Sequence, residues 1–202
     1  MKRIVLMGLL ALALPLAAFG TDFTNSGGSL TGSNTGLSLS GSVLIAVNGL
    51  GGSGLITGND LGSLTFSTGA LSSGDLQNGG TFASGGSFVI TGNGSNGVPN
   101  GVIFTGSFSG PVTWTMVTLA NGTHNYTLTG TLSGVWTSTG ATVNGATVQL
   151  TINTGKGFFN GQTMISSGDT NIVTSVPEPG TLGLLGTGLV GLAGALRRKL
   201  KA

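Results

Sequence analysis

Apolar and polar residues alternate with a period of two along several stretches of the chain, most clearly in residues 37–47, 112–116, 126–136 and 146–152. Such a period places one set of side chains on the core side of a β-strand and the other set in water. In the first stretch the predicted core side holds Leu37, Leu39, Gly41, Val43, Ile45 and Val47. The central part of the chain is therefore predicted to be all-β.

Asn-Gly dipeptides punctuate these stretches, beginning at Asn48, Asn78, Asn93, Asn96, Asn100, Asn121, Asn144 and Asn160. Glycine and asparagine tolerate the positive φ angles of tight hairpin turns. We expect strands near residues 37–48, 63–68, 80–84, 86–91, 101–109, 111–119, 124–137, 141–153 and 162–174. Consecutive strands joined by short turns favour an antiparallel β-sandwich or a barrel-like body.

A solenoid is the structural alternative. The hexapeptide pattern Thr-Gly-[Ser/Thr]-x-[Ser/Thr]-Gly starts at Thr31, Thr105 and Thr129. The spacings between these starts are 74 and 24 residues, whereas a solenoid requires a constant period. The sandwich or barrel is therefore preferred.

The central region, residues 21–176, carries very little charge. Lys156 is its only basic residue, and it stands against Asp22, Asp60, Asp75 and Asp169 for a net charge of −3. No basic cluster is available to neutralise phosphates, so nucleic-acid binding is not expected. The chain also has no Cys, which excludes disulfides and thiolate metal ligands.

Residues that could carry chemistry are sparse. The only histidine, His124, follows an Asn-Gly turn and is predicted to be a solvated loop residue. Asp60, Asp75 and Asp169 stand singly in turn contexts, which favours Asx-turns. A hydrolase would need these carboxylates to converge near His124. No Ser lies in a G-x-S-x-G elbow, and neither G-x-G-x-x-G string opens a predicted helix. We expect no catalytic residues, no metal site and no cofactor.

Trp114, Tyr126 and Trp136 fall in phase with aliphatic neighbours and are predicted to be core residues. The alternative is that they stack on sugar rings in a carbohydrate-binding module. The opposite faces of the same strands are rows of Thr and Ser, which could bind glycans or ordered water. So few charged residues and prolines leave strand edges unprotected, which predicts edge-to-edge self-association.

Both ends of the chain have the pattern of targeting segments. Lys2 and Arg3 precede an apolar run over residues 4–16, and Ala18 and Gly20 supply small residues for cleavage before residue 21. Residues 1–20 are thus predicted to be a helical signal peptide. Near the other end, an apolar run over residues 180–196 would span roughly 25 Å as a transmembrane helix.

The C-terminal residues carry an ordered set of features. Pro177, Glu178 and Pro179 precede the apolar run, and Arg197, Arg198 and Lys199 follow it as a membrane stop signal. This arrangement over residues 176–202, with a signal peptide at the other end, resembles the PEP-CTERM sorting domain of Gram-negative bacteria. The resemblance implies an exosortase-type membrane enzyme as a partner. It also implies an inner-membrane-tethered precursor and export to the cell surface or the exopolysaccharide matrix.

The sequence thus predicts three parts: a signal peptide (1–20), an all-β extracytoplasmic body (21–176) and a sorting signal with a transmembrane helix and a basic tail (177–202). We interpret the chain as a non-enzymatic surface or matrix protein of structural or interaction type. The expected partner of the body is exopolysaccharide or a second copy of the chain. The alternative is a carbohydrate-binding module at the cell surface.

Overall fold

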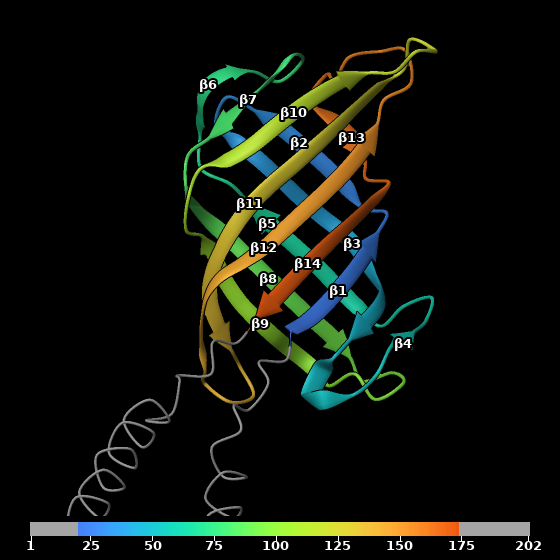
Figure 1. The fold of residues 1–202 in the computed structure, drawn as a ribbon, viewed down its shortest axis with the longest axis vertical. Coiled ribbons are helices and arrows are strands. Elements are labelled where there is room, and N and C mark those ends of the chain that lie inside the picture. Colours follow the sequence, from blue (N-terminus) through green and yellow to red (C-terminus); the bar gives the residue numbers. More distant parts are fainter. Residues whose placement is uncertain (1–19, 174–202) are drawn as a thin grey trace, which may run out of the picture. The chain divides into compact units, whose positions relative to one another are not determined.

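The computed structural model describes residues 20–173, which form β-strands and one short 3-10 helix (Figure 1). The elements are β1 (Gly20–Ser26), β2 (Ser29–Ser33), β3 (Gly36–Asn48), η1 (Leu50–Gly52), β4 (Ile56–Thr57), β5 (Gly62–Ser67), β6 (Leu71–Asp75), β7 (Gly79–Phe82), β8 (Gly85–Asn93), β9 (Asn100–Phe108), β10 (Val112–Thr118), β11 (His124–Trp136), β12 (Thr142–Asn153), β13 (Gln162–Met164) and β14 (Ser167–Val173).

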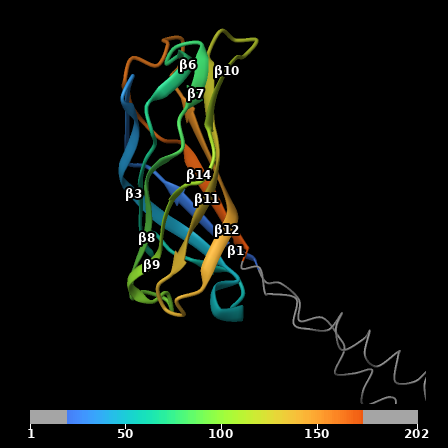
Figure 2. The same cartoon turned by 90° about the vertical axis from the view of Figure 1, so that its left-hand side faces the viewer.

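Eight of these strands close into an antiparallel barrel. Their order around the ring is β1, β3, β5, β8, β9, β11, β12 and β14, and β14 pairs again with β1. The all-β prediction is confirmed, and of the two predicted alternatives, sandwich and barrel, the structure shows the barrel. The solenoid alternative is wrong, because antiparallel neighbours joined by hairpins replace a stacked repeat. The barrel is flattened, with β3, β8 and β9 in one wall and β11, β12 and β14 in the other (Figure 2).

Further strands extend the barrel at one end. The first half of β11 pairs with β10, which pairs with β7 and through it with β6. On the other side, β2 pairs with β3 and β13. Ring closure pairs the eight barrel strands on both sides, so the exposed strand edges among residues 20–173 are those of short strands such as β6 and β13. The predicted edge-to-edge association stays a prediction.

The predicted strands match β3, β5 and β7 to β12 to within two residues at either end. The predicted strand 162–174 is interrupted after Met164 and continues as β14. The short strands β2, β4 and β6 were not expected from the alternation, and neither was β1. β1 begins at Gly20, the last residue of the predicted signal peptide, whereas Ala18 lies outside the described residues.

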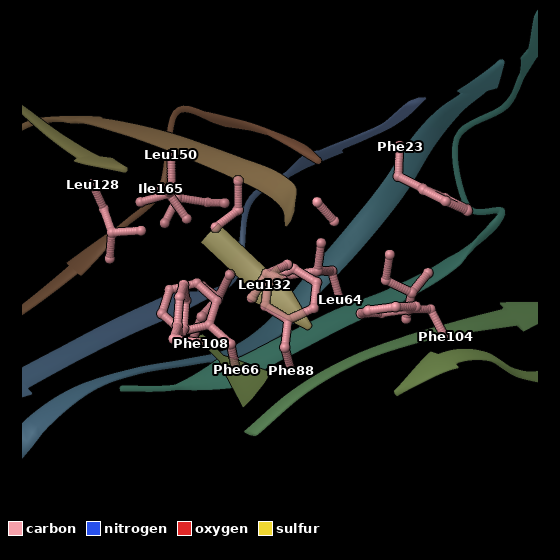
Figure 3. Close-up of a cluster of buried hydrophobic side chains, with 14 of the residues drawn as sticks. Phe23, Leu64, Phe66, Phe88, Phe104, Phe108, Leu128, Leu132, Leu150 and Ile165 are labelled. Atoms are coloured by element: carbon pink, nitrogen blue, oxygen red, sulfur yellow. The ribbon is translucent and has the colours of Figure 1, made fainter. Parts of the chain in front are cut away.

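The interior of the barrel is filled by side chains from both walls. Phe66, Phe88, Phe104 and Phe108 come from one wall, and the leucines of β11 and β12 point toward them from the other (Figure 3). The ring centroid of Phe88 lies 6.0 Å from that of Phe66 and 6.1 Å from that of Phe108. Tight packing of this kind makes the interior a core and leaves the outer surface for binding.

The core face of β3 differs from the predicted one because the register of this strand is irregular. The pairing with β5 shifts between Leu39 and Ser42, at Gly41, whose φ is +67°. Beyond the shift, Ser42 and Leu44 face the core, while Ile45 is 36% exposed. The prediction that Gly41, Val43 and Ile45 share the core face is therefore wrong, because a bulge reverses the phase of the alternation.

The glycine of every Asn-Gly dipeptide has a positive φ, as the turn chemistry predicts. Two of the eight nevertheless lie within strands, one at the start of β9 (Asn100 and Gly101) and one in β12. Asn144 and Gly145 lie within β12, where the register against β11 shifts between Leu132 and Ser133. A glycine with φ +82° here forms a bulge, which increases the local twist that barrel closure needs.

Replacing Phe88 with Ala should lower the free energy of unfolding by about 3–5 kcal/mol, because it removes a fully buried ring and leaves a cavity among three other phenylalanines. Urea denaturation measures the change. The exposed Thr105→Ala on the neighbouring strand is the control and should cost less than about 1 kcal/mol. An equal effect of the two substitutions would contradict a packed interior.

Candidate functional site

Two of the predicted Asx-turn residues do organise turns. Asp60 Oδ1 accepts a hydrogen bond from the backbone N–H of Gly62 at 3.0 Å. Asp75 Oδ1 accepts hydrogen bonds from the backbone N–H groups of Gln77 at 2.8 Å and Asn78 at 2.6 Å. The Asn78 side chain, its backbone N–H and that of Gln77 together hold the pKa of the Asp75 carboxyl below its ordinary value. Both carboxylates therefore serve local structure.

Replacing Asp75 with Ala should destabilise the protein more at about pH 7 than at about pH 2.5. The folded pKa lies below the unfolded one, so the stability that the carboxylate contributes is present above about pH 4 and is lost as the pH falls through the folded value. Urea denaturation of both proteins at the two pH values gives the comparison. An equal difference at both pH values would contradict the role of the ionised carboxylate.

Asp169 lies in β14, and not in a turn as predicted. Its Oδ1 accepts a hydrogen bond from Thr24 Oγ1 on β1 at 2.8 Å. On the same pair of strands, the Asn171 side-chain amide donates to Asp22 Oδ1. Asp169 and Asp22 thus share one pair of strands, apart from Asp60 and Asp75 in their turns. The convergence of Asp60, Asp75 and Asp169 near His124 that a hydrolase would need is not observed among residues 20–173.

His124 is a structural residue, and the prediction of a solvated loop position is wrong. It is the first residue of β11 and only 8% exposed. Its Nδ1 lies 3.0 Å from Thr118 Oγ1, and its ring stacks on Phe158 with 4.4 Å between centroids. Its backbone N–H donates to the backbone oxygen of Gly155 at 2.7 Å, which extends the pairing with β11 beyond the end of β12. The loop after β12 covers the ring, which local sequence does not reveal.

The three large aromatic residues are buried, as predicted for core positions. Trp114 is 1% exposed, Tyr126 is 0% exposed and Trp136 is 7% exposed. Trp114 Nε1 donates to the backbone oxygen of Leu76 at 3.0 Å, and the Tyr126 hydroxyl donates to that of Gln77 at 2.7 Å. These residues cannot form an exposed aromatic platform for sugar rings.

Outward-facing polar residues form two rows across adjacent strands, most of which lie in the wall that faces the viewer in Figure 1. Strand register places each residue of a row opposite the next. The first row is Thr113, Thr129, Gln149, Asp169 and Thr24, and the second is Thr131, Thr147, Asn171, Asp22 and Asn48. Together we call them the polar rows. They cross β10, β11, β12, β14, β1 and β3.

The polar rows line an open groove of about 840 Å³. All ten of their residues border it, along with the exposed Leu55 and Pro111. The inward-facing residues Gly130 and Val148, which pair with each other between the rows, contribute its floor. The lining contains hydroxyls, amides and two carboxylates but no basic residue. Such a surface can exchange hydrogen bonds with an uncharged, hydroxyl-rich ligand.

The alternation of residues in β10, β11 and β12 predicted that their outer faces would be rich in Thr. It did not reveal the other half of the groove, because β1 and β14 come from opposite ends of the sequence. The register of β14 against β12 joins Asp169 and Asn171 to the rows, and the register of β1 against β14 then joins Thr24 and Asp22.

Within residues 20–173, no group of three or more acidic or histidine side chains is placed to hold a metal ion. The same residues include no helix long and apolar enough to cross a membrane. The predicted membrane helix 180–196, the motif Pro177, Glu178 and Pro179, and the stop signal Arg197, Arg198 and Lys199 lie outside the described residues.

Comparison with protein families matches residues 175–199 to the PEP-CTERM protein-sorting motif. The match includes the Pro-Glu-Pro residues and the basic cluster from which the resemblance was inferred. Comparison with curated proteins and with solved structures gives no match to this chain. The chain thus carries a PEP-CTERM sorting motif, which implies export, a membrane-anchored precursor and processing by an exosortase for the cell surface.

Proposed function

We propose that this protein is a non-enzymatic component of the cell surface or the extracellular matrix, and that its β-barrel body acts by structural or binding interactions. The observation that carries the proposal is the position of the sorting motif, which begins two residues after β14 ends at Val173. The barrel is thus the part of the chain that the motif delivers. Removal of the tail by the exosortase and a cleavable N-terminal signal peptide belong to the same proposal.

The arrangement of the body supports this role. Gly20 pairs with Val173, so the chain enters and leaves the barrel side by side at one end. The turn between β6 and β7 and the start of β11 lie at the opposite end of the barrel (Figure 1). A body that is attached at one end leaves its walls and its far end accessible to other molecules.

The side chains of the body also suit a binding protein better than an enzyme. The interior is occupied by hydrophobic side chains, and the carboxylates of Asp60 and Asp75 are engaged by the backbone of their own turns. The outer groove offers hydrogen-bonding groups from hydroxyls and amides. We therefore favour recognition of a ligand over its conversion.

Replacing Pro177, Glu178 and Pro179 together with Ala should leave the protein at full length in the membrane fraction of the native host. The unaltered chain should lose its tail and reach the surface or the medium. Cell fractionation followed by intact-mass measurement distinguishes the two. Lys156→Ala, in the loop after β12, is the control and should be sorted normally. Unchanged mass and location of the triple variant would contradict sorting through this motif.

A carbohydrate-binding role is the second candidate. Sugar binding by exposed aromatic rings is not supported, because Trp114, Tyr126 and Trp136 are buried. Sugar binding by hydroxyl and amide side chains is supported by the groove, because all ten residues of the polar rows line it.

A further inference from the structure

We propose that the groove between the polar rows binds an extended, uncharged polysaccharide that runs across the strands, and that its carboxylates exclude anionic polymers. This inference rests on the second candidate function. It does not depend on how the protein is sorted, because binding to the purified chain can be measured without export.

The dimensions of the groove fit a chain ligand. The polar rows extend from β10 to β3 across six adjacent strands, which corresponds to about 24 Å at the usual separation of neighbouring strands. The groove is open to solvent, and its lining includes Pro111, next to the start of β10, and Leu55, beyond β3. Leu55 is 68% exposed, which gives the C–H groups of a sugar an apolar surface to contact.

The chemistry of the rows fits sugar hydroxyls. A threonine hydroxyl both donates and accepts a hydrogen bond, and so do the amides of Gln149 and Asn48. A sugar hydroxyl does the same, so neighbouring positions in a row can each find a partner. Ordered water is the alternative ligand of such threonine rows. A flat layer of water would need a flat surface, whereas adjacent strands are twisted and the surface between the rows is hollow.

The site is held in shape before any ligand arrives. Thr24 donates to Asp169, and Asn171 donates to Asp22, which ties β1 to β14 within the rows. The β-branched threonines have restricted χ1 angles, and they stand on a wall whose inner face is packed. Little side-chain entropy is therefore lost on binding, which favours measurable affinity from individually weak hydrogen bonds.

Charge gives the site its selectivity. Asp22 and Asp169 lie on neighbouring strands in adjacent rows, and no basic residue lines the groove. A polymer of uronic acids placed across the rows would bring its carboxylates within a Debye length of both, about 8 Å at physiological ionic strength. Uncharged polymers avoid this repulsion and keep the hydrogen bonds.

Titration calorimetry of the purified full chain in detergent, with cellohexaose as the uncharged probe, tests the site. Thr113→Val, Thr129→Val and Thr147→Val together remove three groove hydroxyls at nearly constant shape, and the affinity should fall at least about tenfold. The matched control is Thr115→Val, Thr127→Val and Thr151→Val, which alters one residue on each of the same three strands outside the groove. The control should bind as the unaltered chain does.

Alginate, an anionic polymer, tests the selectivity. The unaltered chain should bind it more weakly than cellohexaose. Asp22→Asn with Asp169→Asn keeps an acceptor oxygen for Asn171 and Thr24, and it should strengthen alginate binding by about fivefold or more. No cellohexaose binding by the unaltered chain, equal losses in the two threonine variants, or alginate binding that the aspartate variant does not improve would each overturn the proposal. Thermal melting of each variant verifies that it is folded.

Discussion

The pairing of β1 with β14 is the constraint on which the rest of the structure depends. It joins residues from the two ends of the described chain, from Gly20 opposite Val173 to Asn25 opposite Gly168. Without it the sheet would have two long free edges, and this body has few of the charged residues and prolines that protect such edges. The same pairing closes the interior, joins the polar rows and brings Gly20 and Val173, the two ends of the described region, to one end of the barrel.

Local sequence predicted the parts of the fold that local physics determines. Alternation located β11 and β12 to within one residue, since both strands present one face to the core and the other to water. It could not locate β6, where Ser and Gly remove the apolar signal. It also placed Gly41, Val43 and Ile45 on the wrong face of β3. The bulge at Gly41 shifts the register of β3 against β5, and the fold, not the local sequence, determines which strand pairs there.

The candidate site was predictable to a similar extent. The threonine faces of β10, β11 and β12 followed from the same alternation, as did the burial of Trp114 and Tyr126. The assembly of the groove did not, because it depends on register between distant strands. His124 illustrates the converse error: its neighbours in sequence suggested exposure, but Phe158 from another loop covers it.

The position of β14 also determines when the body can fold. Export through a membrane delivers the N-terminal strand first. One edge of β1 can then pair with β3, but its other edge must wait for β14 at the far end of the region. Contacts so distant in sequence form slowly, because a long loop must be ordered before they contribute. The ring therefore cannot close until β14, its final strand, has crossed. Completion of the barrel is coupled in time to arrival of the sorting motif at the membrane.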